Sequence, residues 1–282
     1  MIERLAVVGL GLLGGSVAKA ARTRGLARRI VGVARNPAAL EAARDDGTVD
    51  LLTSDLGPGL AEADLCVLAT PVAVLESMLP AVWQAAAPHA MITDVGSTKA
   101  RIVARADALA ATRPLRFVGS HPMAGSERTG YAVARADLFE GATVVLTPSA
   151  RTDAAALARV GEFWLATGAR LVRLDPASHD RAVAAVSHLP HLVADALVDA
   201  VIRMDPAFFD IAGRGLKDTT RIAAASPPLW REIFQDNREA LGEALGAFRK
   251  GLDHLEGLLA AGDGAALEQE LDRIKRAREQ LG

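Results

Sequence analysis

A glycine-rich turn near the amino terminus limits the folds open to this chain more than any other feature. Residues 9–14 read G-L-G-L-L-G, after the apolar run Leu5–Val8 and before a helical pattern over Leu13–Thr23. G-x-G-x-x-G between a strand and a helix is the fingerprint of a dinucleotide-binding βαβ unit. Gly9 permits the tight turn, Gly11 lets the backbone approach a pyrophosphate at the helix N-terminus, and Gly14 lets the helix pack close to the sheet. The residues expected to bind the cofactor here are Gly9, Leu10, Gly11, Leu12, Leu13 and Gly14.

Short apolar runs alternate with helical patterns through the first part of the chain. The runs expected to be strands are Leu5–Val8, Arg29–Ala34, Leu51–Leu52, Leu65–Ala69, Met91–Asp94, Phe117–Gly119, Thr143–Thr147 and Arg170–Leu174. The helical patterns between them are Leu13–Thr23, Pro37–Asp45 with Asn36 as its cap, Val74–Ala86, Lys99–Ala111 and Asp153–Thr167. This alternation predicts parallel βαβ units in a doubly wound sheet of the Rossmann type, with both faces covered by helices.

The pattern changes after Leu174, where no further run is typical of a strand. The helices expected there are Ser178–Arg203, with a kink at Pro190, and Asp218–Ala225, Pro228–Gly262 and Gly264–Leu281. The expected fold class is therefore α/β, with a doubly wound parallel sheet followed by an all-helical C-terminal domain. We predict a dinucleotide-binding domain over residues 1–174 and a helical domain for substrate binding and dimerisation over residues 175–282.

The predicted helical domain carries many apolar side chains at helical spacing. They are Leu241, Leu245, Phe248, Leu252, Leu255 and Leu259. A domain of about 108 residues has too small a core to bury all of them. A second copy of the chain would cover them, which predicts a homodimer; packing against the sheet domain is the alternative.

The composition excludes several classes of protein. There are 32 basic and 34 acidic side chains, for a net charge of −2, so no excess of positive charge points to nucleic acid or to a membrane surface. No apolar run is expected to reach the roughly 18–20 residues that cross a bilayer. The single cysteine, Cys66, and the absence of zinc-ligand spacing among the histidines predict a cytoplasmic protein without a metal site.

The end of the second predicted strand bears on the choice of dinucleotide. An acidic residue at this position binds the ribose hydroxyls of NAD, whereas an arginine accommodates the 2′-phosphate of NADP. The sequence reads Ala34-Arg35-Asn36, without a carboxylate. Arg35, with Asn36 beside it, favours NADP slightly; NAD stays open, since Arg35 could equally be a solvated surface charge. Thr70 and Pro71 follow another strand and are expected on the nicotinamide side of the cofactor.

Four polar segments are not explained by the fold alone. They are D-V-G-S-T-K at 94–99, H-P-M-A-G at 121–125, S-H-L-P-H at 187–191, and K-D-T-T-R-I-A at 217–223 followed by Trp230. Their order and spacing, with the glycine-rich start, closely resemble the prephenate/arogenate dehydrogenase family of tyrosine biosynthesis. The resemblance covers essentially the whole chain. It implies oxidation of a cyclohexadienyl ring alcohol, with hydride transfer to a nicotinamide and loss of CO₂.

The resemblance also implies roles for individual residues. His121 matches the family's catalytic histidine, whose imidazole can accept the alcohol proton near neutral pH. Ser97 matches the serine that orients the hydroxyl and this histidine, although it could instead cap the helix that follows. Arg221 matches the arginine that binds a substrate carboxylate through its planar fork. Asp94 is placed among the cofactor-binding residues.

Further substrate contacts are implied with alternatives left open. His191 is expected to meet the substrate side chain with help from Ser187, while His188 either touches substrate or supports a residue that does. Ser126 is expected near a substrate carboxylate, in its own subunit or across a subunit boundary. The remaining two candidates are Asp218, which could pair with Arg221 at i, i+3, and Trp230, which lies either in the core or at the pocket.

Substrate choice and rival functions also follow from these motifs. His191 favours prephenate, whereas arogenate-preferring relatives tend to lack this histidine. Asp218 could accept an ammonium group, so an arogenate or dual-specificity cyclohexadienyl dehydrogenase is the alternative. A β-hydroxyacid dehydrogenase would need a G-x-S-G-G segment, which is absent. Pyrroline carboxylate reductase is a related two-domain alternative. A protein that senses the cofactor without catalysis would not need Ser97, His121, His191 and Arg221 together.

Overall fold

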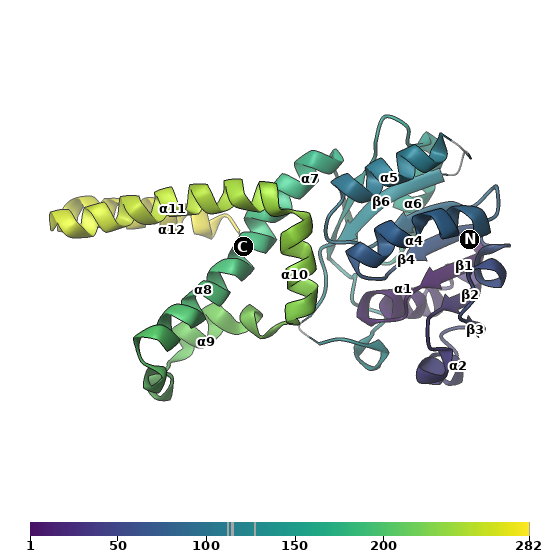
Figure 1. The fold of residues 1–282 in the computed structure, drawn as a ribbon, viewed down its shortest axis with the longest axis horizontal. Helices are drawn as coiled ribbons and strands as arrows, with labels where there is room; N and C mark the ends of the chain where they lie inside the picture. Colours follow the sequence, from purple (N-terminus) through teal and green to yellow (C-terminus); the bar gives the residue numbers. More distant parts are fainter. Residues whose placement is uncertain (112, 114–115, 127, 282) are drawn as a thin grey trace.

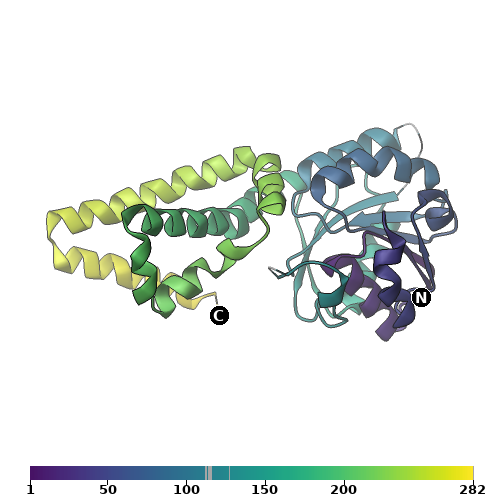
Figure 2. The same ribbon diagram turned by 60° about the horizontal axis from the view of Figure 1, so that its bottom comes forward.

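The chain folds into a sheet unit and a helical unit that lie side by side (Figures 1 and 2). The computed structural model describes residues 1–111, 113, 116–126 and 128–281. In the sheet unit, helices cover both faces of one eight-stranded sheet. From residue 176 onward the described residues form helices and short connections only, with no strand. The predicted fold class, α/β with an all-helical C-terminal part, is confirmed.

The strands lie in the order β3-β2-β1-β4-β5-β6-β7-β8. Their bounds are β1 (Ile2–Val8), β2 (Ala27–Val33), β3 (Leu51–Thr53), β4 (Leu65–Leu68), β5 (Met91–Asp94), β6 (Arg116–Pro122), β7 (Thr143–Thr147) and β8 (Arg170–Arg173). The expectation of a wholly parallel sheet is wrong at one place, because β7 runs antiparallel to β6. A parallel pair needs a crossover, usually a helix. The described residues between β6 and β7 contain only the 3₁₀ turn η2 (Tyr131–Val133).

The sheet helices follow the predicted pattern with small differences at their ends. They are α1 (Leu12–Thr23), η1 (Pro37–Leu40), α2 (Glu41–Asp45), α3 (Leu56–Leu60), α4 (Val72–Ala85), α5 (Ala100–Ala110) and α6 (Ala154–Ala166). Asn36 makes no side-chain cap hydrogen bond, so its predicted capping role is wrong, and the short helix α3 was not predicted. Two apolar clusters form the core. α1 and α6 pack on one face of the sheet, while α4 and α5 pack on the other.

The helical unit contains two irregular points that the sequence pattern did not predict. Its elements are α7 (Pro176–Val183), the π-turn η3 (Ala184–His188), α8 (Leu189–Met204), η4 (Pro206–Ile211), α9 (Arg214–Thr220), η5 (Arg221–Ala224), α10 (Pro227–Asp236), α11 (Arg238–Ala261) and α12 (Gly264–Glu279). The predicted kink at Pro190 is replaced by the π-turn before it. Pro190 lies in the first turn of α8, where proline is tolerated. The predicted helix over Pro228–Gly262 is broken at Asn237 into α10 and α11.

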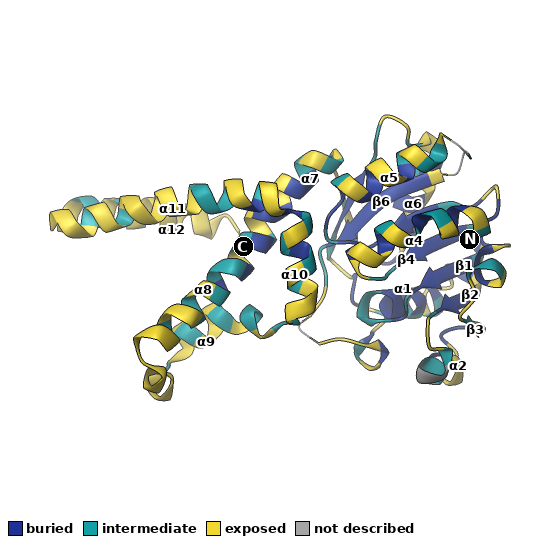
Figure 3. Ribbon diagram, viewed as in Figure 1, coloured by how far each residue is buried: buried dark blue, intermediate teal, exposed yellow. Residues whose placement is uncertain are grey.

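Many residues of the helical unit are exposed to solvent (Figure 3). Exposed apolar side chains there include Val186, Ile202, Met204, Ile211, Leu252, Leu259 and Leu271. The continuous helix over residues 176–204 is long and apolar enough, by length and composition, to cross a membrane, and only 17% of its apolar window is buried. The sequence expectation concerned unbroken apolar runs, and charged side chains such as Asp180, Arg181 and Asp195 interrupt this helix. The same helix carries buried polar histidines, which would be costly in a lipid core.

A buried carboxylate joins the two units. Asp180 on α7 accepts hydrogen bonds from the backbone N–H groups of Lys99 and Ala100 at 2.8 and 2.9 Å, so it caps α5 from the helical unit. Asp236, at the end of α10, binds the Thr98 hydroxyl and the Arg101 guanidinium. The alternative that Ser97 caps this helix is wrong, because Asp180 occupies that role.

Candidate active site

The β1–α1 turn has the geometry that a dinucleotide site requires. Gly9 has a φ of 92°, and a Cβ there would lie 2.6 Å from the carbonyl oxygen of Ala69. A Cβ on Gly14 would lie 1.8 Å from the carbonyl oxygen of Gly9. Gly11, by contrast, has nothing within 4 Å of an added Cβ, so the fold itself does not require glycine there. Open space at Gly11, and an α1 N-terminus without a side-chain cap, fit a bound pyrophosphate.

The other expected cofactor residues lie at the carboxyl edge of the sheet, and all but Asp94 are at least partly exposed. Thr70 is half-buried and Pro71 is exposed after β4, which pairs with β1. Arg35 and Asn36 are exposed after β2, and no ion pair holds Arg35 within the described part of the chain. The side chain of Asp94 is completely buried, so the expectation that it contacts the cofactor is wrong.

Asp94 instead belongs to a buried polar network beneath the strand ends. Its carboxylate accepts hydrogen bonds from the backbone N–H groups of Gly96 and Ser120, and it forms an ion pair with the fully buried Lys99. Lys99 also donates to the carbonyl oxygen of Ser120 at 3.1 Å. Burial lowers the pKa of Lys99, while Asp94 favours its charged form. The network fixes the end of β5 against β6, one residue before His121.

His121 lies near the end of β6 and heads a chain of three buried side chains. Its Nδ1 lies 2.9 Å from Nε2 of His179, and Nδ1 of His179 lies 2.8 Å from Oδ1 of Asp180. An ionised carboxylate can only accept, so Nδ1–H of His179 donates to Asp180 and its Nε2 accepts from Nδ1–H of His121. The Nε2 of His121 is therefore left with a lone pair, the form that a general base needs.

The electrostatics of His121 also favour its neutral form. The ring is 7% exposed. Burial, followed by the positive charges that His179, Lys99 and His188 carry or can carry, holds the pKa of His121 well below its usual 6.5. Sequence reasoning missed His179 and Asp180. The available signal was a histidine next to an aspartate, eight and seven positions before the start of S-H-L-P-H, but Ser178 and Arg181 beside them make the pair look like part of a polar helix face.

A second group of rings surrounds His188 and His191. The imidazole of His191 stacks on the indole of Trp230, with centroids 3.5 Å apart and planes 19° apart. His188 meets the same indole edge-on at 6.1 Å. Burial lowers the pKa of both histidines, that of His188 to about 4. The structure therefore brings Trp230 together with both histidines of the S-H-L-P-H motif.

The remaining expected site residues are more exposed to solvent than the three histidines. Ser97 is half-buried and makes no hydrogen bond to His121 among the described residues. Ser187 on η3 is also half-buried, while Asp218 and Arg221 are exposed on α9 and η5. Ser126 is exposed, and its Oγ accepts a hydrogen bond from the backbone N–H of Arg128 at 3.1 Å. The expected pairing of Asp218 with Arg221 stays a prediction.

Comparisons with known proteins identify the family. Residues 17–173 match the prephenate dehydrogenase nucleotide-binding domain, and residues 175–273 match the prephenate dehydrogenase dimerization domain. The chain belongs to the prephenate dehydrogenase family. It is 33% identical to prephenate dehydrogenase of Bacillus subtilis, over 100% of this chain and 76% of that protein. It is an NAD(P)-dependent oxidoreductase.

Relatives in the same family are named for different activities. The cyclohexadienyl dehydrogenase of Zymomonas mobilis is 31% identical, over 99% of this chain and 96% of that protein. Prephenate dehydrogenase of Aquifex aeolicus, solved with hydroxyphenyl propionate and NAD⁺, superposes with a TM-score of 0.93 at 34% identity, covering 100% of this chain and 99% of that one. Synechocystis arogenate dehydrogenase gives 0.86 at 32% identity, covering 99% and 100%. A 3-hydroxyisobutyrate dehydrogenase at 14% identity shares the fold alone.

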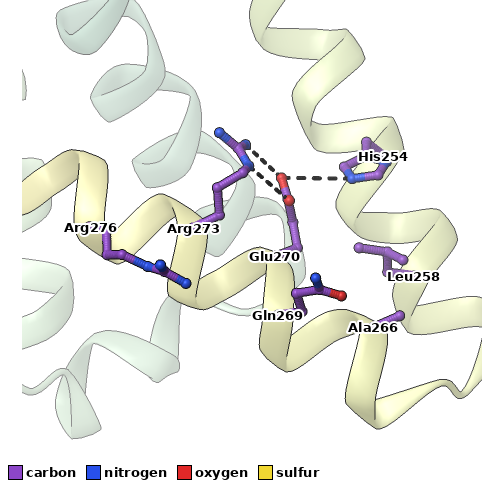
Figure 4. A pocket seen from close by; sticks show the side chains of 7 residues that line it. All are labelled: His254, Leu258, Ala266, Gln269, Glu270, Arg273 and Arg276. Atoms are coloured by element: carbon purple, nitrogen blue, oxygen red, sulfur yellow. Dashed lines mark hydrogen bonds and ion pairs between the residues drawn. The ribbon is translucent and has the colours of Figure 1, made fainter.

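Possible metal ligands and the hollow between α11 and α12 were compared with the expected site residues. The described residues contain no group of histidine, cysteine and acidic side chains that could hold a metal ion. A hollow of about 450 Å³ lies between α11 and α12 (Figure 4). Its charged side chains pair with one another, because Arg273 donates to Glu270 at 2.6 and 2.9 Å and His254 faces the same carboxylate. None of the expected site residues lines it.

Proposed function

We propose that this chain oxidises prephenate to 4-hydroxyphenylpyruvate and CO₂. One observation carries the proposal: the chain from Asp180 through His179 to His121 leaves a neutral imidazole with its Nε2 lone pair available. Such a group can accept the proton of a ring alcohol. The same protein has a β1–α1 turn whose geometry fits a bound dinucleotide.

The residues would divide the reaction as follows. A bound nicotinamide would supply the hydride acceptor, with its dinucleotide held by the β1–α1 turn, Thr70 and Pro71. His121 would take the hydroxyl proton at Nε2. The resulting positive charge would be stabilised through His179 by the carboxylate of Asp180, which is already ionised and hydrogen-bonded. Loss of CO₂ from the ring then leaves an aromatic product and needs no further acid or base.

Substrate placement is proposed from the residues around this base. Arg221 would bind a carboxylate, aimed by Asp218, and Ser97 would orient the hydroxyl. His191, held flat against Trp230, would meet the substrate side chain together with Ser187. Ser126 would approach a carboxylate from the loop after β6. The close stacking of His191 on Trp230, at 3.5 Å, supports one fixed position for the side-chain contact.

Arogenate is the second candidate substrate. Arogenate is kept as a candidate because the Zymomonas relative is named a cyclohexadienyl dehydrogenase and the Synechocystis relative an arogenate dehydrogenase. Asp218 is an exposed carboxylate that could bind an ammonium group. His191 supports prephenate, because a neutral imidazole can donate its N–H to the keto oxygen of that side chain, whereas an ammonium group offers this N–H no acceptor.

For the cofactor, we propose a modest preference for NADP over NAD. Arg35 stands two residues after the end of β2, is exposed, and has no ion-pair partner among the described residues. A guanidinium in this position is available for a 2′-phosphate.

We also propose that residues 175–282 form a dimerisation domain distinct from residues 1–174, and that the protein is a cytoplasmic homodimer. The exposed apolar side chains of α8, α11 and α12 support this, as does the match to a dimerization domain. A second copy would cover the apolar face of the helix over residues 176–204. Binding of that second copy would not remove further water from the histidines of this helix, because they are already buried.

A two-by-two assay tests the proposal. Purified protein is mixed with prephenate or arogenate and with NAD⁺ or NADP⁺, and the reduced cofactor is followed by absorbance. Turnover with prephenate supports the main function, while turnover with arogenate alone favours the second candidate. If folded protein binds the cofactor but turns over neither substrate, the proposal is wrong.

A further inference from the structure

Asn237 lies at the break between α10 and α11, and its side chain is buried. Only 5% of the residue is exposed. Its Nδ2 lies 2.7 Å from the carbonyl oxygen of Asp180 and 3.1 Å from Nδ1 of His188. Asparagine at the start of a helix commonly caps it, but this side chain makes no cap hydrogen bond to α11. It is used entirely for the two contacts with α7 and η3.

These contacts fix the proton on His188. A carbonyl oxygen can only accept, so the NH₂ of Asn237 must face Asp180. The same nitrogen then presents its second hydrogen to Nδ1 of His188, which must accept. A neutral imidazole that accepts at Nδ1 carries its proton at Nε2.

The Nε2 of His188 is buried and has no hydrogen-bond partner among the residues that the structure describes. The residue is 1% exposed, and its ring lies close enough to His121, His179 and His191 for their charges to act on it. A buried N–H without a partner costs free energy, which a hydrogen bond to a ligand would recover.

We propose that Asn237 is a positioning residue that holds His188 as a neutral Nε2–H donor toward an oxygen atom of the substrate. This inference rests on the proposed function. The two histidines then have opposite tautomers. His121 is held as an acceptor at Nε2 by Asp180 acting through His179, and His188 is held as a donor at Nε2 by Asn237. Both arrangements use the same turn of α7, since Asn237 also binds the carbonyl group of Asp180.

The groups that face His188 leave it neutral. Asp180 favours the charged imidazolium, whereas burial, His179 and His191 disfavour it. Trp230 contacts the ring edge-on and carries no charge. A neutral donor suits a substrate oxygen without adding a second cation beside His121, which must itself become positive during the reaction.

Asn237→Asp is the matched substitution, because it keeps the shape and removes the amide donor. A carboxylate at this position accepts from Nδ1–H of His188, so the neutral ring carries its proton at Nδ1 and loses the donor at Nε2. The ring tautomer is read directly from ¹⁵N chemical shifts of histidine-labelled protein, with the His188 signals assigned by their loss in His188→Gln. We expect protonated Nε2 and unprotonated Nδ1 in the wild type, and a protonated Nδ1 in Asn237→Asp.

Kinetics test whether the tautomer matters. Asn237→Asp is expected to raise KM for prephenate by about tenfold, the effect of one lost hydrogen bond to a charged group, and to leave the Kd for the cofactor unchanged. Because Asn237 acts through His188, the double variant with His188→Gln should be no worse than His188→Gln alone. The inference would be overturned if the KM increases of the two single variants multiply in the double variant, or if the wild-type His188 ring is protonated at Nδ1.

Two controls keep these outcomes separate. If Asn237→Asp does not fold, Asn237→Ala removes the donor without adding charge and should give a mixture of the two His188 tautomers. An unmixed Nε2–H signal in that variant would also overturn the inference. Wild-type protein that oxidises neither prephenate nor arogenate would refute the proposed function, whereas the ¹⁵N spectrum would still report whether Asn237 sets the tautomer.

Discussion

Replacing Asp180 with asparagine would test the hydrogen-bond chain behind His121. In the wild type, Oδ1 of Asp180 accepts from Nδ1 of His179 and from the backbone of Lys99, and Oδ2 accepts from the backbone of Ala100. An asparagine amide can face His179 with its nitrogen, which moves the His179 proton to Nε2 and the His121 proton to its own Nε2. The base then has no lone pair for the substrate hydroxyl.

Either orientation of the asparagine removes the negative charge that stabilises a protonated His121. We therefore expect kcat to fall by about 10²–10⁴-fold, the range for a lost general base; the same exchange behind a serine-protease histidine costs about 10⁴-fold. Each orientation also leaves one backbone N–H of α5 facing an amide nitrogen. The lost cap should cost about 1 kcal/mol of unfolding free energy. Raising the pH should not restore kcat, because a neutral imidazole does not lose its second proton in the accessible range.

The assay is the initial rate with prephenate at saturating cofactor, alongside thermal unfolding and the cofactor Kd. Asp236→Asn is the matched control. Asp236 also joins the two units, through Thr98 and Arg101, but does not touch His179. It should lose stability and keep its kcat. An Asp180→Asn enzyme that turns over like the wild type, with His121 still required, would refute the relay.

Four further predictions use the same assays. His121→Asn should lower kcat by about 10²–10⁴-fold with the unfolding midpoint unchanged, and normal turnover would exclude it as the base. Arg221→Ala should raise KM for prephenate about 10–100-fold through one lost charge-assisted contact, with an unchanged KM arguing against a carboxylate contact. Arg35→Ala should raise KM for NADP⁺ but not for NAD⁺, and equal changes would contradict a phosphate contact. The pKa of His188 is about 4 in the folded chain against 6.5 ordinarily, so between these pH values the unfolded state binds one more proton than the folded state. Denaturant titrations should therefore show the free energy of unfolding falling as the pH drops through that window. A flat profile would count against a neutral buried ring.

The sequence predicted the parallel part of the fold well, because each βαβ unit is signalled locally. Met91–Asp94 and Thr143–Thr147 were predicted with the observed bounds. The direction of β7 was not, since an apolar run of five residues reads the same in either direction. The break at Asn237 was also missed, because the apolar spacing continues across it and the cause, two contacts with another helix, lies far away in the chain.

The site could be predicted only where a motif carried it. His121, His188 and His191 stand in recognisable segments, and all three are buried in one region of the structure. Asp94 was misjudged because a polar residue after a strand reads equally as a ligand contact or as structural support, and its burial decides for support. For Ser97 the cap from Asp180 removes only the capping alternative, and its contact with the substrate hydroxyl stays a prediction.

The π-turn explains how His179 and Asp180 on α7 come to share a helix face with the histidines of the S-H-L-P-H motif. At about 100° per residue in an α-helix, His179 and His191 would point roughly 120° apart, and Asp180 and His188 roughly 80° apart. The π-turn over Ala184–His188 accommodates about one extra residue, so each pair behaves as if it were one position closer. Both separations then shrink to roughly 20°. One local irregularity thus aligns the residues that hold the base with those expected to hold the substrate, which is consistent with π-turns occurring at functional sites.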